Sequence, residues 1–241
     1  MTADNRIIDI NADVGLGFEG ENSAHDEKVI KRLTSANIAC GFQGGDPAVM
    51  LRSVDYCVKY EVEIGASVGI PALMGFDTSE DFDDMHLEGM SSLGSSLKKV
   101  SAKKVYAQVI YQLGALMAFA TARKRRVAHL KPHGALYEAA CCDTQVAKSI
   151  AQAVSDVDPS IIIIAPAGSE LQSASVEMGL KVRAELVVQS ADLISQGMPA
   201  DIDSIGVVSS DDYAVMLIDE ILRALRKENI TVQAQNQSQV R

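Results

Sequence analysis

The sequence lacks an excess of basic residues, and this argues against two classes of partner. Lys and Arg together number 22 against 32 Asp and Glu, which gives a formal net charge of −10 at pH 7. Nucleic acids and anionic membrane surfaces are bound by clustered Lys and Arg. We therefore expect neither a nucleic acid nor a membrane as a partner, and we expect a small-molecule substrate instead.

The sequence also lacks the common signals of export, membrane insertion and nucleotide binding. No uninterrupted apolar run reaches the length of a membrane span, and the first residues show no signal-peptide pattern. The four cysteines match neither a disulfide framework nor a zinc site. No Walker-type phosphate loop or dinucleotide fingerprint is present. These absences predict a cytoplasmic protein.

What the sequence does contain is an α/β pattern. Ile- and Val-rich strands alternate with helices, in about seven strand–helix units. This favours a closed or nearly closed parallel β/α barrel over an open sheet, in one domain over residues 1–232, with a polar and disordered tail at 233–241. We expect strands at 6–13, 35–42, 63–67, 127–132, 161–165, 182–188 and 205–208. Helices are expected at 46–60, 98–124, 144–154, 169–178 and 211–226, with an irregular stretch at 68–95.

One strand carries three polar residues in alternation. His129, Lys131 and His133 fall on one face of the strand at 127–132, just before Gly134. Two imidazoles and an ammonium would be costly to bury in an ordinary core, so this face is expected to line a polar cavity. The alternative is a solvent-exposed strand end without a role.

Polar residues at the ends of the other strands are expected to meet this face. In a β/α barrel the site lies at the carboxyl ends of the strands. We predict His133 as the main acid–base residue, Asp13 as its orienter or co-base, and Lys131 as the stabiliser of a developing oxyanion. The residues expected to bind substrate are Asn11, Asn37, Gln43, Ser67, His129, Tyr137 and Glu185.

Several segments resemble one protein family. They are Asn11 to Gly15, Ser35 to Pro47, Tyr111 to Leu116 and Lys131 to Tyr137, and they resemble the LamB/YcsF family. Its characterised bacterial members are the A subunit of ATP-dependent 5-oxoprolinase. The resemblance implies an irregular seven-stranded β/α barrel related to glycoside hydrolases and polysaccharide deacetylases. It also implies an enzyme that opens a lactam or cyclic amide such as 5-oxoproline. ATP would then be the cofactor, if the activity is retained, and partner subunits or a homo-oligomer are possible.

The sequence departs from the family pattern at several motif positions. The family has His where Gln43 and Ser67 stand, Glu where Leu16 stands, and Asp and Arg where Gln189 and Ser190 stand. Loss of Arg removes the usual clamp for a carboxylate or phosphate. The alternative reading is therefore a recruited lyase, cyclase or isomerase that acts on a larger neutral heterocycle without ATP. A third reading is a catalytically inactive protein that only binds a ligand or partner.

The related deacetylases raise the question of a metal. The two family histidines replaced by Gln43 and Ser67 are absent as ligands, and Asp13 and His133 alone are too few for a tight site. We predict no catalytic metal, and no cofactor other than the possible ATP.

Overall fold

The computed structural model describes residues 6–18, 23–42, 44–70, 82–84, 98–195, 197–208 and 212–234. Its centre is a parallel sheet in the order β10-β1-β2-β3-β6-β7-β8-β9, and an additional pairing of β1 with β9 closes seven of these strands into a barrel. The strands are β1 (Ile7–Val14), β2 (Ser35–Ala39), β3 (Glu63–Val68), β6 (Val127–Pro132), β7 (Ile162–Pro166), β8 (Val182–Val188), β9 (Ser204–Val207) and β10 (Thr231–Val232). The predicted seven-stranded parallel β/α barrel is confirmed.

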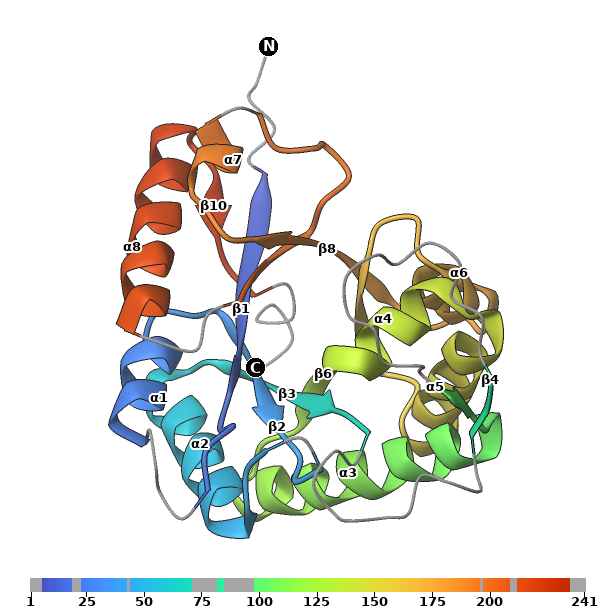
Figure 1. The fold of residues 1–241 in the computed structure, drawn as a ribbon. Coiled ribbons are helices and arrows are strands. Elements are labelled where there is room, and N and C mark those ends of the chain that lie inside the picture. Colours follow the sequence, from blue (N-terminus) through green and yellow to red (C-terminus); the bar gives the residue numbers. More distant parts are fainter. Residues whose placement is uncertain are drawn as a thin grey trace.

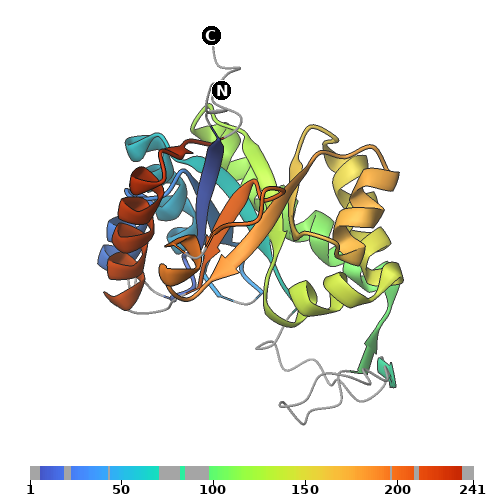
Figure 2. The same ribbon diagram turned by 90° about the horizontal axis from the view of Figure 1, so that it is seen from above.

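Helices surround this barrel (Figure 1 and Figure 2). They are α1 (Ser23–Ile30), α2 (Pro47–Tyr60), α3 (Ala102–Ala122), α4 (Gly134–Cys142), α5 (Thr144–Val157), α6 (Glu170–Glu177), α7 (Asp192–Ser195) and α8 (Asp212–Lys227). The start of α2 follows from its sequence. The Asp46 side chain accepts hydrogen bonds from the backbone N–H groups of Ala48 and Val49, and Pro47 takes the first helical position.

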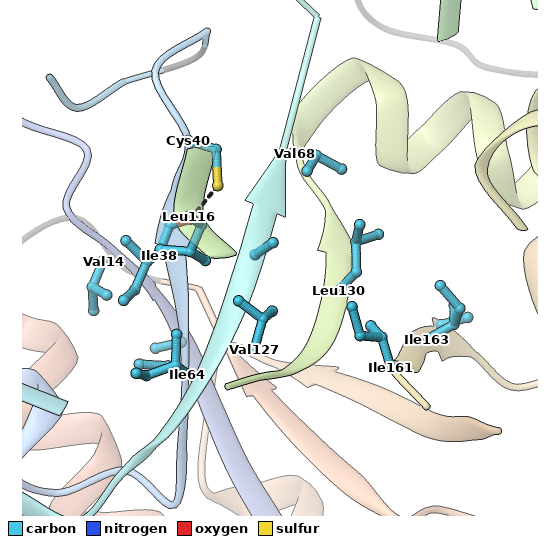
Figure 3. Packing of buried hydrophobic residues seen from close by; sticks show 14 of the residues in the cluster. Val14, Ile38, Cys40, Ile64, Val68, Leu116, Val127, Leu130, Ile161 and Ile163 are labelled. Atoms are coloured by element: carbon cyan, nitrogen blue, oxygen red, sulfur yellow. Dashed lines mark hydrogen bonds between the residues drawn. The ribbon is translucent and has the colours of Figure 1, made fainter. Parts of the chain in front are cut away.

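The hydrophobic core lies between the barrel and its helices. Ile8, Ile10 and Ala12 are buried on one face of β1, which is the outward face. Leu130 of β6 and Ile163 of β7 belong to the same cluster, together with Leu116 of α3 (Figure 3). Because side chains alternate along a strand, the opposite face of each strand must point into the barrel, and this face is polar on most strands but apolar on β7.

The structure corrects the predicted elements at several points. Residues 98–100 form strand β5 (Lys98–Val100), which pairs antiparallel with β4 (Phe82–Asp84), and α3 starts only after Ser101. The helices α1, α4 and α7 and the strand β10 were not predicted. Strand β6 passes directly into α4, because Gly134 adopts a left-handed conformation with φ 55°. Most of the predicted irregular stretch, at 71–81 and 85–95, and the predicted tail from residue 235 lie outside the described residues.

Helix α3 is the one helix of the described chain that is long and apolar enough to cross a membrane by length and composition alone. Polar residues such as Lys103 and Gln108 interrupt it, which is why no uninterrupted apolar run was found in the sequence. One face of α3 packs on β3 and β6 and against the helices α2 and α5. Helix α3 therefore packs as one of the helices that surround the barrel.

Candidate active site

Polar side chains from most strands point into the interior of the barrel. Asp9, Asn11 and Asp13 occupy alternate positions of β1, and their partners include residues on strands that are not neighbours of β1 in the sheet. Asn11 Nδ2 donates a 2.8 Å hydrogen bond to Glu185 Oε1 on β8, although β9 lies between these strands. This contact passes over Gly206 of β9 on the inward face of the sheet. The predicted alternation of β1 and β6 is therefore confirmed, and the polar faces share one interior.

Two glycines make room for this interior. A Cβ placed on Gly65 of β3 would lie 1.8 Å from His129 Nε2, and one placed on Gly206 of β9 would lie 2.1 Å from Glu185 Oε1. Real Cβ atoms do not approach other atoms so closely. Strands β3 and β9 thus carry glycine where the large polar side chains of β6 and β8 must pass over them.

The first pair of the site is Asp13 with His133. The two side chains lie 2.6 Å apart, from Asp13 Oδ2 to His133 Nδ1, and both are partly exposed at the carboxyl ends of β1 and β6. Burial raises the pKa of Asp13, but the hydrogen bond with His133 and the charge of Lys131 outweigh it and hold that pKa below its ordinary value. The carboxylate is therefore ionised and accepts a hydrogen bond from Nδ1–H of His133. Nε2 is then the ring nitrogen left to exchange a proton with another group.

The second pair is Lys131 with Glu185. Lys131 Nζ donates a 2.6 Å hydrogen bond to Glu185 Oε1, and the lysine side chain is only 7% exposed. Burial lowers the pKa of Lys131, but the charges of Glu185 and Asp13 outweigh it and raise the pKa above its usual value. Tyr137 of α4 donates a 2.9 Å hydrogen bond to Glu185 Oε2, and burial with the Glu185 charge raises the pKa of this phenol. The lysine therefore stays charged and the tyrosine stays protonated.

Two asparagines connect the pairs. Asn37 Nδ2 donates hydrogen bonds to Asn11 Oδ1 at 2.7 Å and to Asp13 Oδ1 at 2.9 Å. His129 Nε2 donates to Asn37 Oδ1 at 2.8 Å. Burial and the nearby Arg183 lower the pKa of His129 to about 3, so this imidazole is neutral. Asn11, Asn37 and His129 are fully buried, and all three orient other polar residues.

The floor of the barrel holds an ionic cluster that the sequence analysis did not identify. Arg183 of β8 is fully buried, with NH1 3.1 Å from Asp9 Oδ2 and NH2 3.2 Å from Glu63 Oε2. Asp9 also accepts hydrogen bonds from Ser35 and Ser204. The signal was present in the sequence, because Asp9 shares the face of Asn11 and Arg183 shares the face of Glu185.

Two further residues were predicted to bind substrate. Ser67 is buried on β3 and lies beside Lys131 in the strand register. Gln43 lies outside the described residues. Every other predicted site residue lies inside the barrel or at its mouth.

The described residues of the site are not arranged as a metal centre. Within the described ranges, no group of three or more His, Cys, Asp and Glu side chains has the arrangement needed to hold a metal ion. Asp13 and His133 contact each other, and Glu185 is occupied by Lys131 and Tyr137. The absence of a catalytic metal stays a prediction.

The sequence matches one protein family over most of its length. A family model described as "LamB/YcsF family" matches residues 8–80 and 91–193. The chain is 35% identical over 234 residues to the A subunit of 5-oxoprolinase from Geobacillus thermodenitrificans, a match that covers 95% of this chain and 84% of that protein. It is 34% identical over 220 residues to the A subunit of 5-oxoprolinase from Bacillus subtilis, a match that covers 90% of this chain and 77% of that protein.

Two solved structures have a fold similar to that of this chain. The crystal structure of a lactam utilization protein from Thermus thermophilus covers 94% of this chain and 99% of its own, with a TM-score of 0.77 and 28% identity. A putative cellobiose-phosphate cleavage protein from Enterococcus faecalis covers 99% of this chain and 100% of its own, with a TM-score of 0.60 and 13% identity. The second similarity concerns the fold alone.

Proposed function

The chain belongs to the LamB/YcsF family, and from this premise we propose that it is an enzyme subunit that opens a cyclic amide, the class of compound to which 5-oxoproline belongs. The observation that carries the proposal is the 2.6 Å contact between Asp13 and His133 beside the Lys131–Glu185 pair, at the carboxyl ends of the strands. A base and a cation in one enclosed space are the groups that amide hydrolysis requires.

In the proposed reaction, water attacks the carbonyl carbon of the ring. His133 Nε2 takes a proton from that water, and Asp13 stabilises the imidazolium that forms through its bond to Nδ1. The carbonyl oxygen becomes an oxyanion, which the positive charge of Lys131 stabilises. The C–N bond of the ring then breaks, and His133 returns the proton to the leaving nitrogen. The product is an open-chain amino acid.

Asn11 and Asn37 support this chemistry as positioning residues. Asn37 donates to the second oxygen of Asp13, while Asn11 donates to the oxygen of Glu185 that also contacts Lys131. The two amides thereby hold the acid–base pair and the ion pair in a fixed relative position. Their complete burial keeps them from contacting a substrate directly.

The described residues inside the barrel do not fit a nucleoside triphosphate. Within the described part of the chain, the cations inside the barrel are Lys131 and Arg183, and each is already paired with a carboxylate. A triphosphate needs unpaired cations or a loop of backbone N–H groups. If ring opening is coupled to ATP, as the family resemblance implies, we propose that the nucleotide is bound by partner subunits, and no step of the reaction above involves it.

The proposal is tested by a ring-opening assay. The purified chain, alone and together with the partner subunits of a 5-oxoprolinase, is incubated with 2-pyrrolidinone or 5-oxoproline, with and without ATP. Release of a primary amine measures ring opening, and release of ADP measures its coupling to ATP. We expect amine release that requires this chain and that disappears in His133→Ala. If no combination opens either ring, the proposed activity is wrong.

A further inference from the structure

Two exposed valines continue the interior faces of β8 and β9 toward the mouth. On β8, Arg183 and Glu185 point inward, and Val187 is the next residue on that face. On β9, Ser204 and Gly206 face the interior, and Val208 stands at the next alternate position, one residue beyond the end of the strand. Val187 is 36% exposed and Val208 is 55% exposed. Val187 is paired with Gly206 in the strand register, so Val187 on β8 and Val208 just after the end of β9 belong to neighbouring segments.

Polar side chains line the mouth at the ends of β1, β3 and β6, of which β1 is the neighbour of β9. Asp13 of β1, Ser67 of β3, Lys131 of β6 and His133 occupy the corresponding inward positions near the carboxyl ends of their strands. The mouth thus has a reactive polar half and an apolar half. A substrate that fills it must present an amide to the first half and a hydrocarbon surface to the second.

The charge inside the barrel disfavours an anionic substrate. Among the described residues, the carboxylates of Asp9, Asp13, Glu63 and Glu185 lie with the cations of Lys131 and Arg183. These four carboxylates outnumber the two cations by two. Both cations already contact carboxylates, so the carboxylate of 5-oxoproline would meet repulsion and no unpaired cation there.

We propose that Val187 and Val208 form an apolar wall that binds the hydrocarbon substituent of a neutral cyclic amide, and that this wall makes such an amide a better ligand than 5-oxoproline. The inference rests on the proposed function, because it assigns the substrate class of the same site. It makes the two valines specificity-determining residues and leaves the acid–base groups unchanged.

The test is calorimetric binding of three probes to the whole chain. The probes are 1-benzyl-2-pyrrolidinone, 2-pyrrolidinone and 5-oxoproline. Burial of an aromatic substituent against an apolar wall should tighten binding about tenfold or more. We therefore expect the benzyl lactam to bind about tenfold more tightly than 2-pyrrolidinone, and 5-oxoproline to bind most weakly.

Substitution of Val208 should reverse the order of the affinities for the benzyl lactam and 5-oxoproline. Val208→Lys replaces an apolar group with a cation, so it should weaken the benzyl lactam about tenfold and strengthen 5-oxoproline. Val176→Lys is the matched control, because Val176 is a 61% exposed valine near the end of α6, away from the mouth. It makes the same change in charge and should alter neither affinity. Val208→Thr keeps the shape of valine and should weaken the benzyl lactam several-fold, which provides a second variant if Val208→Lys does not fold.

The outcomes separate the two proposals. If the lactams bind but the benzyl group gives no advantage, or if both Val208 variants bind all three probes as the natural chain does, the apolar wall is wrong and the lactam function stands. If the natural chain binds none of the three lactams, the proposed function and the wall both fail.

Discussion

His129 of β6 and Asn37 of β2 are joined by a 2.8 Å hydrogen bond, although strand β3 lies between them. The bond passes over Gly65, whose missing side chain leaves the space that the imidazole occupies. Through Asn37 the contact continues to Asn11 and Asp13. Because Gly65 has no side chain, His129 on β6 can reach Asn37 on β2. Asn37 in turn holds Asp13, one member of the acid–base pair.

Gly65→Ala should destabilise the protein strongly. The added methyl group would overlap the His129 ring, so the ring or the strand must move and the bond to Asn37 must break. Overpacking of a core costs about 1–3 kcal/mol, and a lost buried hydrogen bond adds to it. Urea unfolding measures the free energy. Gly114→Ala in α3 is the control, since its Cβ meets nothing within 4 Å and should stabilise by up to about 1 kcal/mol. Equal stabilities of the two variants would contradict the packing at Gly65.

His129 should make the protein less stable in acid. Its pKa is about 3 in the folded chain against 6.5 in the unfolded chain, so between these values only the unfolded chain takes up the proton. The free energy of unfolding should therefore fall as the pH drops through this window, by up to about 1.4 kcal/mol per pH unit. The lowered pKa of Asp13 acts in the same direction. His129→Gln can still donate to Asn37 but does not titrate.

Urea unfolding at about pH 6 and about pH 4.5, both inside this window, measures the two slopes. The slope of stability against pH should be shallower in His129→Gln than in the natural chain, whatever the absolute stability of the variant. Parallel slopes would mean that His129 already binds its proton in the folded state.

His133→Ala should lower the turnover of a cyclic amide by about 10²–10⁴-fold, because general acid–base catalysis contributes this amount. Its side chain is 26% exposed, so the fold should survive. Asp13→Asn should also lower kcat, since an uncharged amide stabilises the imidazolium poorly. His25→Ala on α1 is the control outside the site. Steady-state kinetics measures the loss of activity, and thermal unfolding shows whether each variant is folded. Full activity in a folded His133→Ala would mean that the segment from Lys131 to Tyr137 has only a structural role.

Lys131 and Glu185 should be energetically coupled. Each is buried, and Lys131→Met or Glu185→Gln alone leaves the other partner without its main contact. Breaking a buried pair in this way costs about 3–5 kcal/mol. The double variant should recover part of that loss, because no unpaired buried charge remains. Urea unfolding of the natural chain, the two single variants and the double variant gives the coupling energy, and simple additivity of the two losses would contradict a direct pair.

The sequence by itself determined the class of fold and the location of the site. Alternation along a strand is a local property with a period of two, so Asp9, Asn11 and Asp13 could be assigned to one face without any knowledge of their neighbours. The same rule put Lys131 beside His133. The barrel followed from the repeated order of strand and helix, and strand ends in such folds meet at one mouth.

Only the tertiary structure decided which of these polar residues contact each other. Closure of the ring by β1 and β9 brings Asn11 to Glu185, and no local pattern predicts a contact between residues so far apart in the chain. In the structure, Asn11 and His129 are buried away from solvent, and Lys131 is paired with Glu185. The sequence can show that a residue faces inward. What it meets there depends on which strands lie across the barrel, and that is decided by the closure of the whole sheet.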